Sequence, residues 1–178
     1  MTDPSRRRLV TALGASALLA GPRLSRAASV VATRSLRFEN LHTGETLAVE
    51  YFAAGRYVPD ALTSVDRLLR DFRTGEVAVI DVALLDLMHR ISMLTASGRP
   101  FQVISGYRSP ATNQALHERS TGVANASLHM RGQAIDIRLP DTPLATLHEA
   151  ALSMRAGGVG YYPKSGFVHV DTGRVRAW

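Results

Sequence analysis

The sequence predicts an α+β fold: a single domain with a mostly antiparallel sheet flanked by helices. Apolar residues recur at helical spacing through much of residues 59–119, whereas short strand-like segments dominate from residue 133 onward. Strand-like pairs near each end are adjacent in sequence and joined by turn residues, as in hairpins. The chain has no cysteine, so its stability depends on packing and any metal site must use His, Asp or Glu.

The first 27 residues have the features of a signal peptide, which leaves residues 28–178 as the domain. Three arginines at 6–8 precede an apolar run at 9–20, and Ser25 and Ala27 are small residues where a signal peptidase reads. The apolar run is shorter than the roughly 20 residues that span a bilayer. The Arg6-Arg7 pair resembles a twin-arginine signal; an ordinary secretory leader is the alternative. Both predict a periplasmic or cell-envelope protein.

The charge does not indicate a nucleic-acid partner. Of the formal net charge of +6, the segment 1–27 holds +4, which leaves +2 for the domain. The domain has no basic run with interleaved aromatic residues, so we expect no nucleic-acid binding. No second apolar run is long enough to cross a membrane. The oligomeric state is not predicted.

The first half of the domain is expected to be a hairpin followed by two helices. Residues 35–40 and 45–52 largely alternate apolar and polar residues around a turn at 42–44. Helices are expected at 59–72 and at about 81–95. Their apolar positions are Leu62, Val65, Leu68 and Leu69 in the first and Leu84, Leu87, Met88, Ile91 and Leu94 in the second.

The second half is expected to alternate strands and helices. A short buried strand at 101–105 leads to a helix from Pro110 to about Arg119, with Ser109 as its cap. A strand at 133–138 and a helix at 143–154 follow. Residues 157–162 and 167–171 form a final hairpin around the turn at 163–166.

Two of these segments offer a set of metal ligands. We place His129 on a loop and Asp136 on the next strand, with Gly132 letting the loop fold back. On the last strand His169 and Asp171 share a face, opposite two valines. Catalytic zinc takes three protein ligands and leaves a fourth position open, so this pattern suits it.

Each of these residues also has a structural explanation. A histidine on a strand is commonly a hydrogen-bonded structural residue, and Asp136 could pair with Arg131 or Arg138. Asp171 could accept backbone hydrogen bonds in a turn. The other histidines lack a convincing set of partner ligands: His42, His89, His117 and His148.

Three segments together resemble the zinc peptidases that act on peptidoglycan. They are Ser105-Gly106-Tyr107-Arg108-Ser109 with Asn113 following, then residues 127–136, then residues 157–171. This family includes D-alanyl-D-alanine carboxypeptidases, vancomycin-resistance dipeptidases, phage endolysin peptidases and murein endopeptidases. The resemblance is strongest to the murein endopeptidases exported by the twin-arginine route, and it covers roughly residues 35–178. It implies the fold shared by these peptidases and the Hedgehog signalling domain.

The resemblance also implies roles for individual residues. His129, Asp136 and His169 would be the zinc ligands, and Arg108 would bind substrate and polarise the scissile carbonyl. Ser109 and Asn113, within the matching segments, would join Arg108 in binding substrate. The family commonly places a glutamate base three residues before the last ligand, where this chain has Gly166. Asp171 is the candidate replacement, with an orienting partner or a further ligand as its alternative roles.

These expectations describe a zinc-dependent murein endopeptidase that cleaves stem-peptide cross-links with a metal-activated water. The alternatives are a D,D-carboxypeptidase of the same fold, a zinc-containing domain that binds peptidoglycan or a partner without hydrolysis, and a metal-free periplasmic binding domain. His and Asp ligands also accept divalent ions other than zinc.

Overall fold

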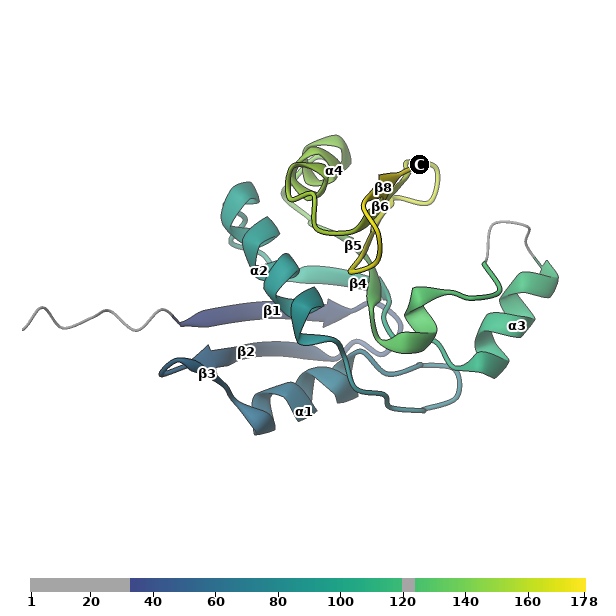
Figure 1. The fold of residues 1–178 in the computed structure, drawn as a ribbon, viewed down its shortest axis with the longest axis horizontal. Coiled ribbons are helices and arrows are strands. Elements are labelled where there is room, and N and C mark those ends of the chain that lie inside the picture. Colours follow the sequence, from purple (N-terminus) through teal and green to yellow (C-terminus); the bar gives the residue numbers. More distant parts are fainter. Residues whose placement is uncertain (1–32, 120–123) are drawn as a thin grey trace, which may run out of the picture. The chain divides into compact units, whose positions relative to one another are not determined.

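A computed structural model describes residues 33–119 and 124–178, which form one folded unit (Figure 1). The predicted signal peptide at 1–27 lies outside the described residues. The unit is built on an eight-stranded sheet with the order β3-β2-β1-β4-β5-β7-β6-β8. The strands are β1 (Arg34–Asn40), β2 (Thr46–Ala53), β3 (Arg56–Tyr57), β4 (Phe101–Ser105), β5 (Ala134–Arg138), β6 (Gly158–Tyr162), β7 (Phe167–Asp171) and β8 (Arg176–Ala177).

The α+β class and the mostly antiparallel sheet are confirmed. Only the pairs β1–β4 and β6–β8 are parallel within the described sheet. The helices are α1 (Pro59–Leu68), α2 (Val82–Thr95), α3 (Pro110–Arg119) and α4 (Leu144–Ser153), with one 3₁₀ turn, η1 (Leu128–Arg131). Helix α1 packs on β2, α2 on β1, and α4 against α2, β6 and β7. In the described part of the chain, no helix combines the length and apolar character that a bilayer span requires.

The sequence patterns explain most of these elements. Leu36 and Phe38 on β1 turn inward, and Phe38 pairs with Phe101 of β4, which joins the N-terminal hairpin to the rest of the sheet. Asp81 caps α2 by accepting a hydrogen bond of 2.9 Å from the amide of Ala83. The predicted inner face of α2 is buried except for Leu94, which is 55% exposed and was wrongly assigned to the core.

Helix α1 ends at Leu68, although the apolar pattern predicted a helix as far as Phe72. The helix ends there because the segment that begins at Asp71 forms a separate hydrogen-bonded turn. The Asp71 amide donates to the Glu76 carbonyl at 2.9 Å, and its carboxylate accepts from the Arg73 amide at 2.9 Å and from the Ser109 amide at 2.8 Å. Asp71 is 1% exposed, so this turn fastens the end of α1 to the start of α3.

The same contacts change the acidity of Asp71. Burial disfavours its charged form, but hydrogen bonds from Thr112, from the Ser109 and Arg73 amides and from the Ser109 hydroxyl outweigh burial and lower the pKa to about 2. A carboxyl group whose pKa is lower in the folded than in the unfolded chain stabilises the fold above the unfolded pKa, and this stability is lost as the pH falls through the folded pKa.

We therefore expect Asp71→Asn to remove part of the acid sensitivity of folding. The difference in unfolding free energy between the wild type and this variant should shrink by about 2 kcal/mol between about pH 5 and pH 2. Urea unfolding at a series of pH values measures this difference. Asp60→Asn, at an exposed site on α1, is the control. A wild-type minus Asp71→Asn difference that does not vary with pH would contradict the assignment.

Candidate metal centre and active site

The loop between β4 and α3 contributes Arg108 to the site and is hydrogen-bonded to Leu69, the residue after α1. The Tyr107 amide donates to the Leu69 carbonyl at 2.7 Å, and the Arg108 amide donates to the His129 carbonyl at 3.2 Å. A side chain on Gly106 would collide with the backbone of Leu69, so glycine permits this close approach. The Gly106 carbonyl is left pointing at the His129 ring, 2.8 Å from its Nδ1.

His129 lies on the 3₁₀ turn η1 rather than on the irregular loop that the sequence suggested. Ser127 caps the turn, and Gly132 ends it with a φ of 65°. A side chain at Gly132 would strike the carbonyl of Val79, while the Gly132 carbonyl accepts from the Asp81 amide at 3.0 Å. The predicted fold-back at Gly132 is confirmed. It holds His129, which is 2% exposed, over the sheet.

Strand register brings the remaining groups into one row. Across β4, β5, β7 and β6 the directly opposed residues are Ser105, Asp136, His169 and Gly160. Opposed residues of neighbouring strands project to the same face with Cβ atoms about 5 Å apart. The Asp136 and His169 side chains therefore meet beneath His129.

Three donor atoms converge at this point. His129 Nε2 lies 3.2 Å from His169 Nδ1 and 3.3 Å from Asp136 Oδ1, and the last two atoms are 2.8 Å apart. Ligands of a tetrahedral zinc ion, bonded at about 2.0–2.1 Å, are about 3.3–3.4 Å from one another. The three residues thus fit a divalent metal ion, as the grouping of their donor atoms also indicates.

The far side of each imidazole is already occupied. His129 Nδ1 faces the Gly106 carbonyl and must donate to it, which leaves Nε2 as a lone-pair donor for a metal. His169 Nε2 lies 3.1 Å from Asp171 Oδ2, which leaves Nδ1 free to face Asp136. Partners of this kind set the tautomer and the orientation of metal-binding histidines.

The electrostatics of the cluster favour a cation. Burial disfavours the Asp136 carboxylate, but the His129 and His169 rings outweigh burial and hold the pKa of Asp136 well below its usual range. Burial likewise opposes a charge on His169, but hydrogen bonds with Asp136 and Asp171 overcome burial and raise its pKa. Asp171 is already paired with Arg176, so Asp136 is the carboxylate whose charge a metal ion between the two rings would balance.

Asp171 lies behind His169. It is fully buried, and its carboxylate accepts from the amides of Gly158 and Gly173 at 2.9 and 2.8 Å. Arg176 adds two contacts through its guanidinium, at 2.6 and 3.2 Å. These partners, together with His169, outweigh the effect of burial and lower the pKa of Asp171. Asp171 contacts His169 Nε2, the ring nitrogen that does not face Asp136.

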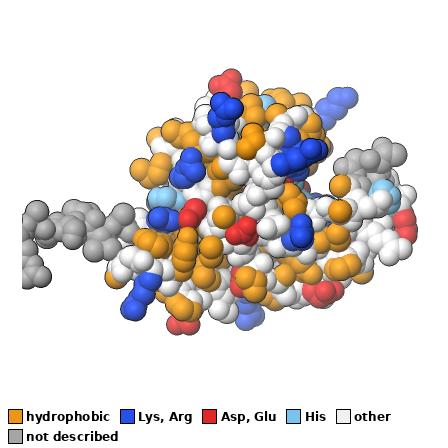
Figure 2. Space-filling view, viewed as in Figure 1, with side chains coloured by type: hydrophobic (Ala, Val, Ile, Leu, Met, Phe, Trp, Pro, Cys, Tyr) orange, Lys and Arg blue, Asp and Glu red, His pale blue; other side chains and the backbone are white. Residues whose placement is uncertain are grey.

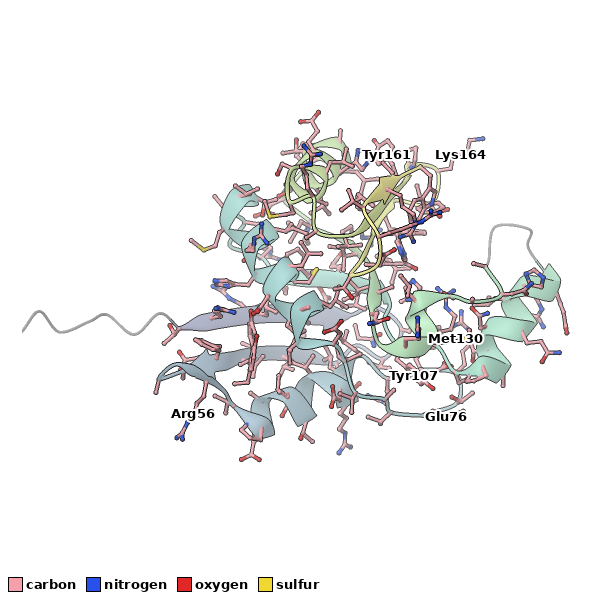
Figure 3. All side chains as sticks on the ribbon, viewed as in Figure 1. Arg56, Glu76, Tyr107, Met130, Tyr161 and Lys164 are labelled. Carbon is pink, nitrogen blue, oxygen red and sulfur yellow. The ribbon has the colours of Figure 1, made fainter. Side chains whose placement is uncertain are left out.

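A cavity of about 420 Å³ opens over the three donor atoms. Figure 3 labels Met130 on η1 and Lys164 in the β6–β7 turn, and other residues of these two elements line the cavity. On the face drawn in Figure 2, basic and acidic side chains are interspersed. The lining residues are Arg108, Ala124, Ala126, Ser127, Leu128, His129, Asp136, Tyr162, Ser165, Phe167, His169, Arg176 and Trp178.

Arg108 lies in the cavity with much of its hydrogen-bonding capacity unused. Its Nη2 contacts Ser105 Oγ at 3.2 Å and Asp136 Oδ2 at 3.4 Å, both long for a charged pair. Its Nε is buried with no partner among the described residues. A guanidinium held this way can bind a carbonyl or carboxylate oxygen of a ligand.

Comparison with known proteins then gives the family. A family described as peptidoglycan L,D-endopeptidase MepK matches residues 28–178. The peptidoglycan L,D-endopeptidase MepK of Escherichia coli strain K12 is 44% identical over 179 residues, covering 99% of this chain and 98% of that protein. The probable peptidoglycan L,D-endopeptidase MepK of Haemophilus influenzae is 44% identical over 146 residues, covering 82% and 78%. This chain belongs to the MepK family. The predicted resemblance to peptidoglycan peptidases is thereby confirmed.

Two residues that were predicted to bind substrate do not reach the cavity. Ser109 is fully buried; its amide donates to Asp71 and its hydroxyl accepts from the Thr112 amide at 3.2 Å as the cap of α3. Asn113 is 3% exposed, and its Nδ2 donates to the Ala124 carbonyl at 3.1 Å. Neither residue is among those that line the cavity, since the Ser109 hydroxyl is bound to the Thr112 amide and the Asn113 amide to the Ala124 carbonyl.

Gly166 lies in the β6–β7 turn with a φ of 71°, a conformation that favours glycine. A glutamate at this position, where the family resemblance places the base, would therefore strain the backbone of this turn. Asp136 is the only carboxylate among the described residues that line the cavity.

The sequence did not single out one side of the cavity, formed by Tyr162, Arg176 and Trp178. Trp178 and Arg176 reach the site through β8, a two-residue strand that pairs in parallel with β6. So short a strand has no alternation to detect.

Three other histidines make structural contacts away from the cavity. His42 Nε2 lies 2.9 Å from the Ile104 carbonyl, His89 Nδ1 lies 3.2 Å from the Ser35 carbonyl, and the His148 ring stacks on Tyr161.

Proposed function

We propose that this protein is a zinc-dependent endopeptidase that hydrolyses L,D peptide bonds in the stem-peptide cross-links of peptidoglycan. The observation that carries the proposal is the convergence of His129 Nε2, His169 Nδ1 and Asp136 Oδ1 on one point of the cavity wall. The names of the related proteins support the substrate and the L,D bond. They also favour an endopeptidase over the D,D-carboxypeptidase alternative.

Each residue of the site has a separate role in the proposed reaction. A zinc ion on the three ligands would supply a Lewis acid and lower the pKa of the attacking water. Arg108, on the β4–α3 loop, would bind the scissile carbonyl oxygen and stabilise its developing negative charge. The carbonyl of Gly106 keeps His129 in the tautomer that offers Nε2. The hydrogen bond from the Ser109 amide to Asp71 holds the loop that carries Arg108.

Asp171 acts in this proposal as a positioning residue for His169, not as the general base. Its carboxylate is buried, is not among the groups that line the cavity, and is bound to Arg176 and two backbone amides. A group held this firmly suits the orientation of a ligand better than the shuttling of protons.

Replacing Asp171 by asparagine should separate these two roles. If Asp171 orients His169, zinc affinity should fall by about 10- to 100-fold, and excess zinc should restore part of the activity. If it is the base, the variant should bind zinc as the wild type does and remain inactive. Zinc competition with a chromogenic chelator measures the affinity, and Asp141→Asn, at an exposed aspartate, is the control.

The function itself is tested by digesting purified peptidoglycan with the protein, with and without a chelator, and separating the products. Loss of cross-linked dimers that stops with chelator and returns with zinc is the expected result. Release of a terminal D-alanine would instead identify a carboxypeptidase.

A non-catalytic, zinc-containing binding domain is the second candidate, because Asp136 is the only carboxylate on the described cavity wall. Binding of peptidoglycan and zinc without any product would establish it.

We also propose that residues 1–27 export the chain to the periplasm, by the twin-arginine route in view of Arg6-Arg7. Replacing both arginines with lysine should then leave the protein in the cytoplasm.

A further inference from the structure

One wall of the cavity contains the indole ring of Trp178, which contacts the side chains of Tyr162, Arg176 and His169. Trp178 is 49% exposed, yet its Nε1 donates to the Tyr162 hydroxyl at 2.6 Å. The Arg176 guanidinium lies 4.8 Å from the centre of the ring, and the His169 ring centre lies 5.3 Å away. The Trp178 backbone is hydrogen-bonded to β6: its amide donates to the Val159 carbonyl, and its carbonyl accepts from the Tyr161 amide.

Gly160 makes room for this ring. It is the cross-strand partner of His169, so a side chain there would stand beside the metal ligand. A methyl group on Gly160 would lie 2.7 Å from Trp178 Cε2 and 2.8 Å from Tyr162 Cε2, closer than carbon atoms approach. The φ of Gly160 is not in the left-handed region, so the backbone does not require glycine. The space occupied by Trp178 is what excludes a side chain.

The charge near this wall is already neutralised. Arg176 is the basic group that contacts Trp178, and both of its terminal nitrogens pair with Asp171. The guanidinium with unused donors is that of Arg108, on another part of the wall. Tyr162 stacks on Phe167, which also lines the cavity, with ring centres 4.6 Å apart and planes 20° apart. The wall thus presents an aromatic surface whose one cation, Arg176, is paired with Asp171, whereas Arg108 has a buried Nε donor without a described partner.

We propose that Trp178 and Tyr162 form a substrate subsite, the aromatic shelf, that takes the aliphatic side of the peptide next to the bond to be cut. Methyl groups or a methylene chain of the peptide lie on the shelf while its carbonyl or carboxylate oxygens face Arg108. Gly160 is a specificity-determining position because its lack of a side chain keeps the shelf beside His169. This proposal deepens the endopeptidase assignment and rests on it for the identity of the substrate.

Trp178 is the only tryptophan of the chain, so its fluorescence reports on the shelf alone. The zinc-loaded full chain is titrated with a soluble monomeric stem peptide, which has the aliphatic groups but no cross-link to cut. We expect a saturable change in emission. In Gly160→Ala the titration midpoint should be at least about tenfold higher, whereas Gly98→Ala, where a methyl group meets nothing within 4 Å, should match the wild type.

Hydrolysis of cross-linked dimers provides the second measurement. Trp178→Leu should raise KM by about tenfold or more with kcat within about threefold and an unchanged zinc content, because contacts equal in the ground and transition states affect KM alone. Trp178→Phe, which keeps a ring but loses the bond to Tyr162, serves if the leucine variant does not fold.

The two proposals fail separately. Wild-type KM in Trp178→Leu and Gly160→Ala, or no emission change at saturating peptide in a protein that cuts dimers, would overturn the shelf. A saturable emission change in a protein that never cuts dimers would sustain the shelf as a peptide-binding site and overturn the endopeptidase assignment.

Discussion

Replacing His129 with alanine should reduce bound zinc to well below one ion per chain and lower hydrolysis of peptidoglycan cross-links by at least about a thousandfold. His129 supplies one of the three donors that the described residues bring together at the site, and two donors hold a divalent ion far more weakly. The change also leaves the Gly106 carbonyl without its partner and Asp136 with one fewer, so we expect a loss of about 1–3 kcal/mol in stability.

His42→Ala is the control for this experiment, because His42 is exposed and contacts the Ile104 carbonyl outside the cavity. Metal content by mass spectrometry and product formation by chromatography are measured on the same samples. A His129→Ala protein that retains one zinc per chain and normal turnover would show that the metal, if any, binds elsewhere.

Replacing Arg108 with lysine should lower kcat by about a hundredfold to a thousandfold while zinc content stays at the wild-type level. A lysine ammonium is a compact point charge and cannot reproduce the planar set of donors that reaches Ser105, Asp136 and a substrate oxygen together. The loss should therefore appear in the chemical step rather than in the assembly of the site.

Arg138→Lys is the matched control. Arg138 lies on β5, two residues after Asp136, but it does not line the cavity, and its Nε donates to Gln102. Activity of Arg108→Lys within about threefold of the wild type would remove Arg108 from the mechanism. Loss of zinc from this variant would instead assign it to the metal site through its contact with Asp136.

The elements that the sequence predicted best are those with local signals. Strand β4 and helix α3 have the predicted bounds, because Pro110 and the Ser109 cap mark the junction by their own chemistry. The end of α1 was predicted too late because the turn at Asp71 depends on the Ser109 amide, 38 residues away. The outward position of Leu94 likewise depends on where the neighbouring helices lie.

For the site, sequence spacing and family resemblance indicated which residues gather, and the structure brings His129, Asp136, His169 and Arg108 to one cavity. Which ring nitrogens face inward could not be predicted, because it depends on the Gly106 carbonyl and on Asp171. The family resemblance implied substrate contact for Ser109 and Asn113 because both belong to a matching segment, but a matching segment does not fix the direction of each side chain. The aromatic shelf depends on the pairing of β8, which leaves no sequence pattern.

The most direct test of the central claim is a crystal structure of the zinc-soaked protein with anomalous scattering recorded on both sides of the zinc absorption edge. We predict one strong peak between His129 Nε2, His169 Nδ1 and Asp136 Oδ1, with Asp171 still bound to His169 Nε2. A peak at another place, or coordination of His169 through Nε2 with Asp171 displaced, would contradict the account.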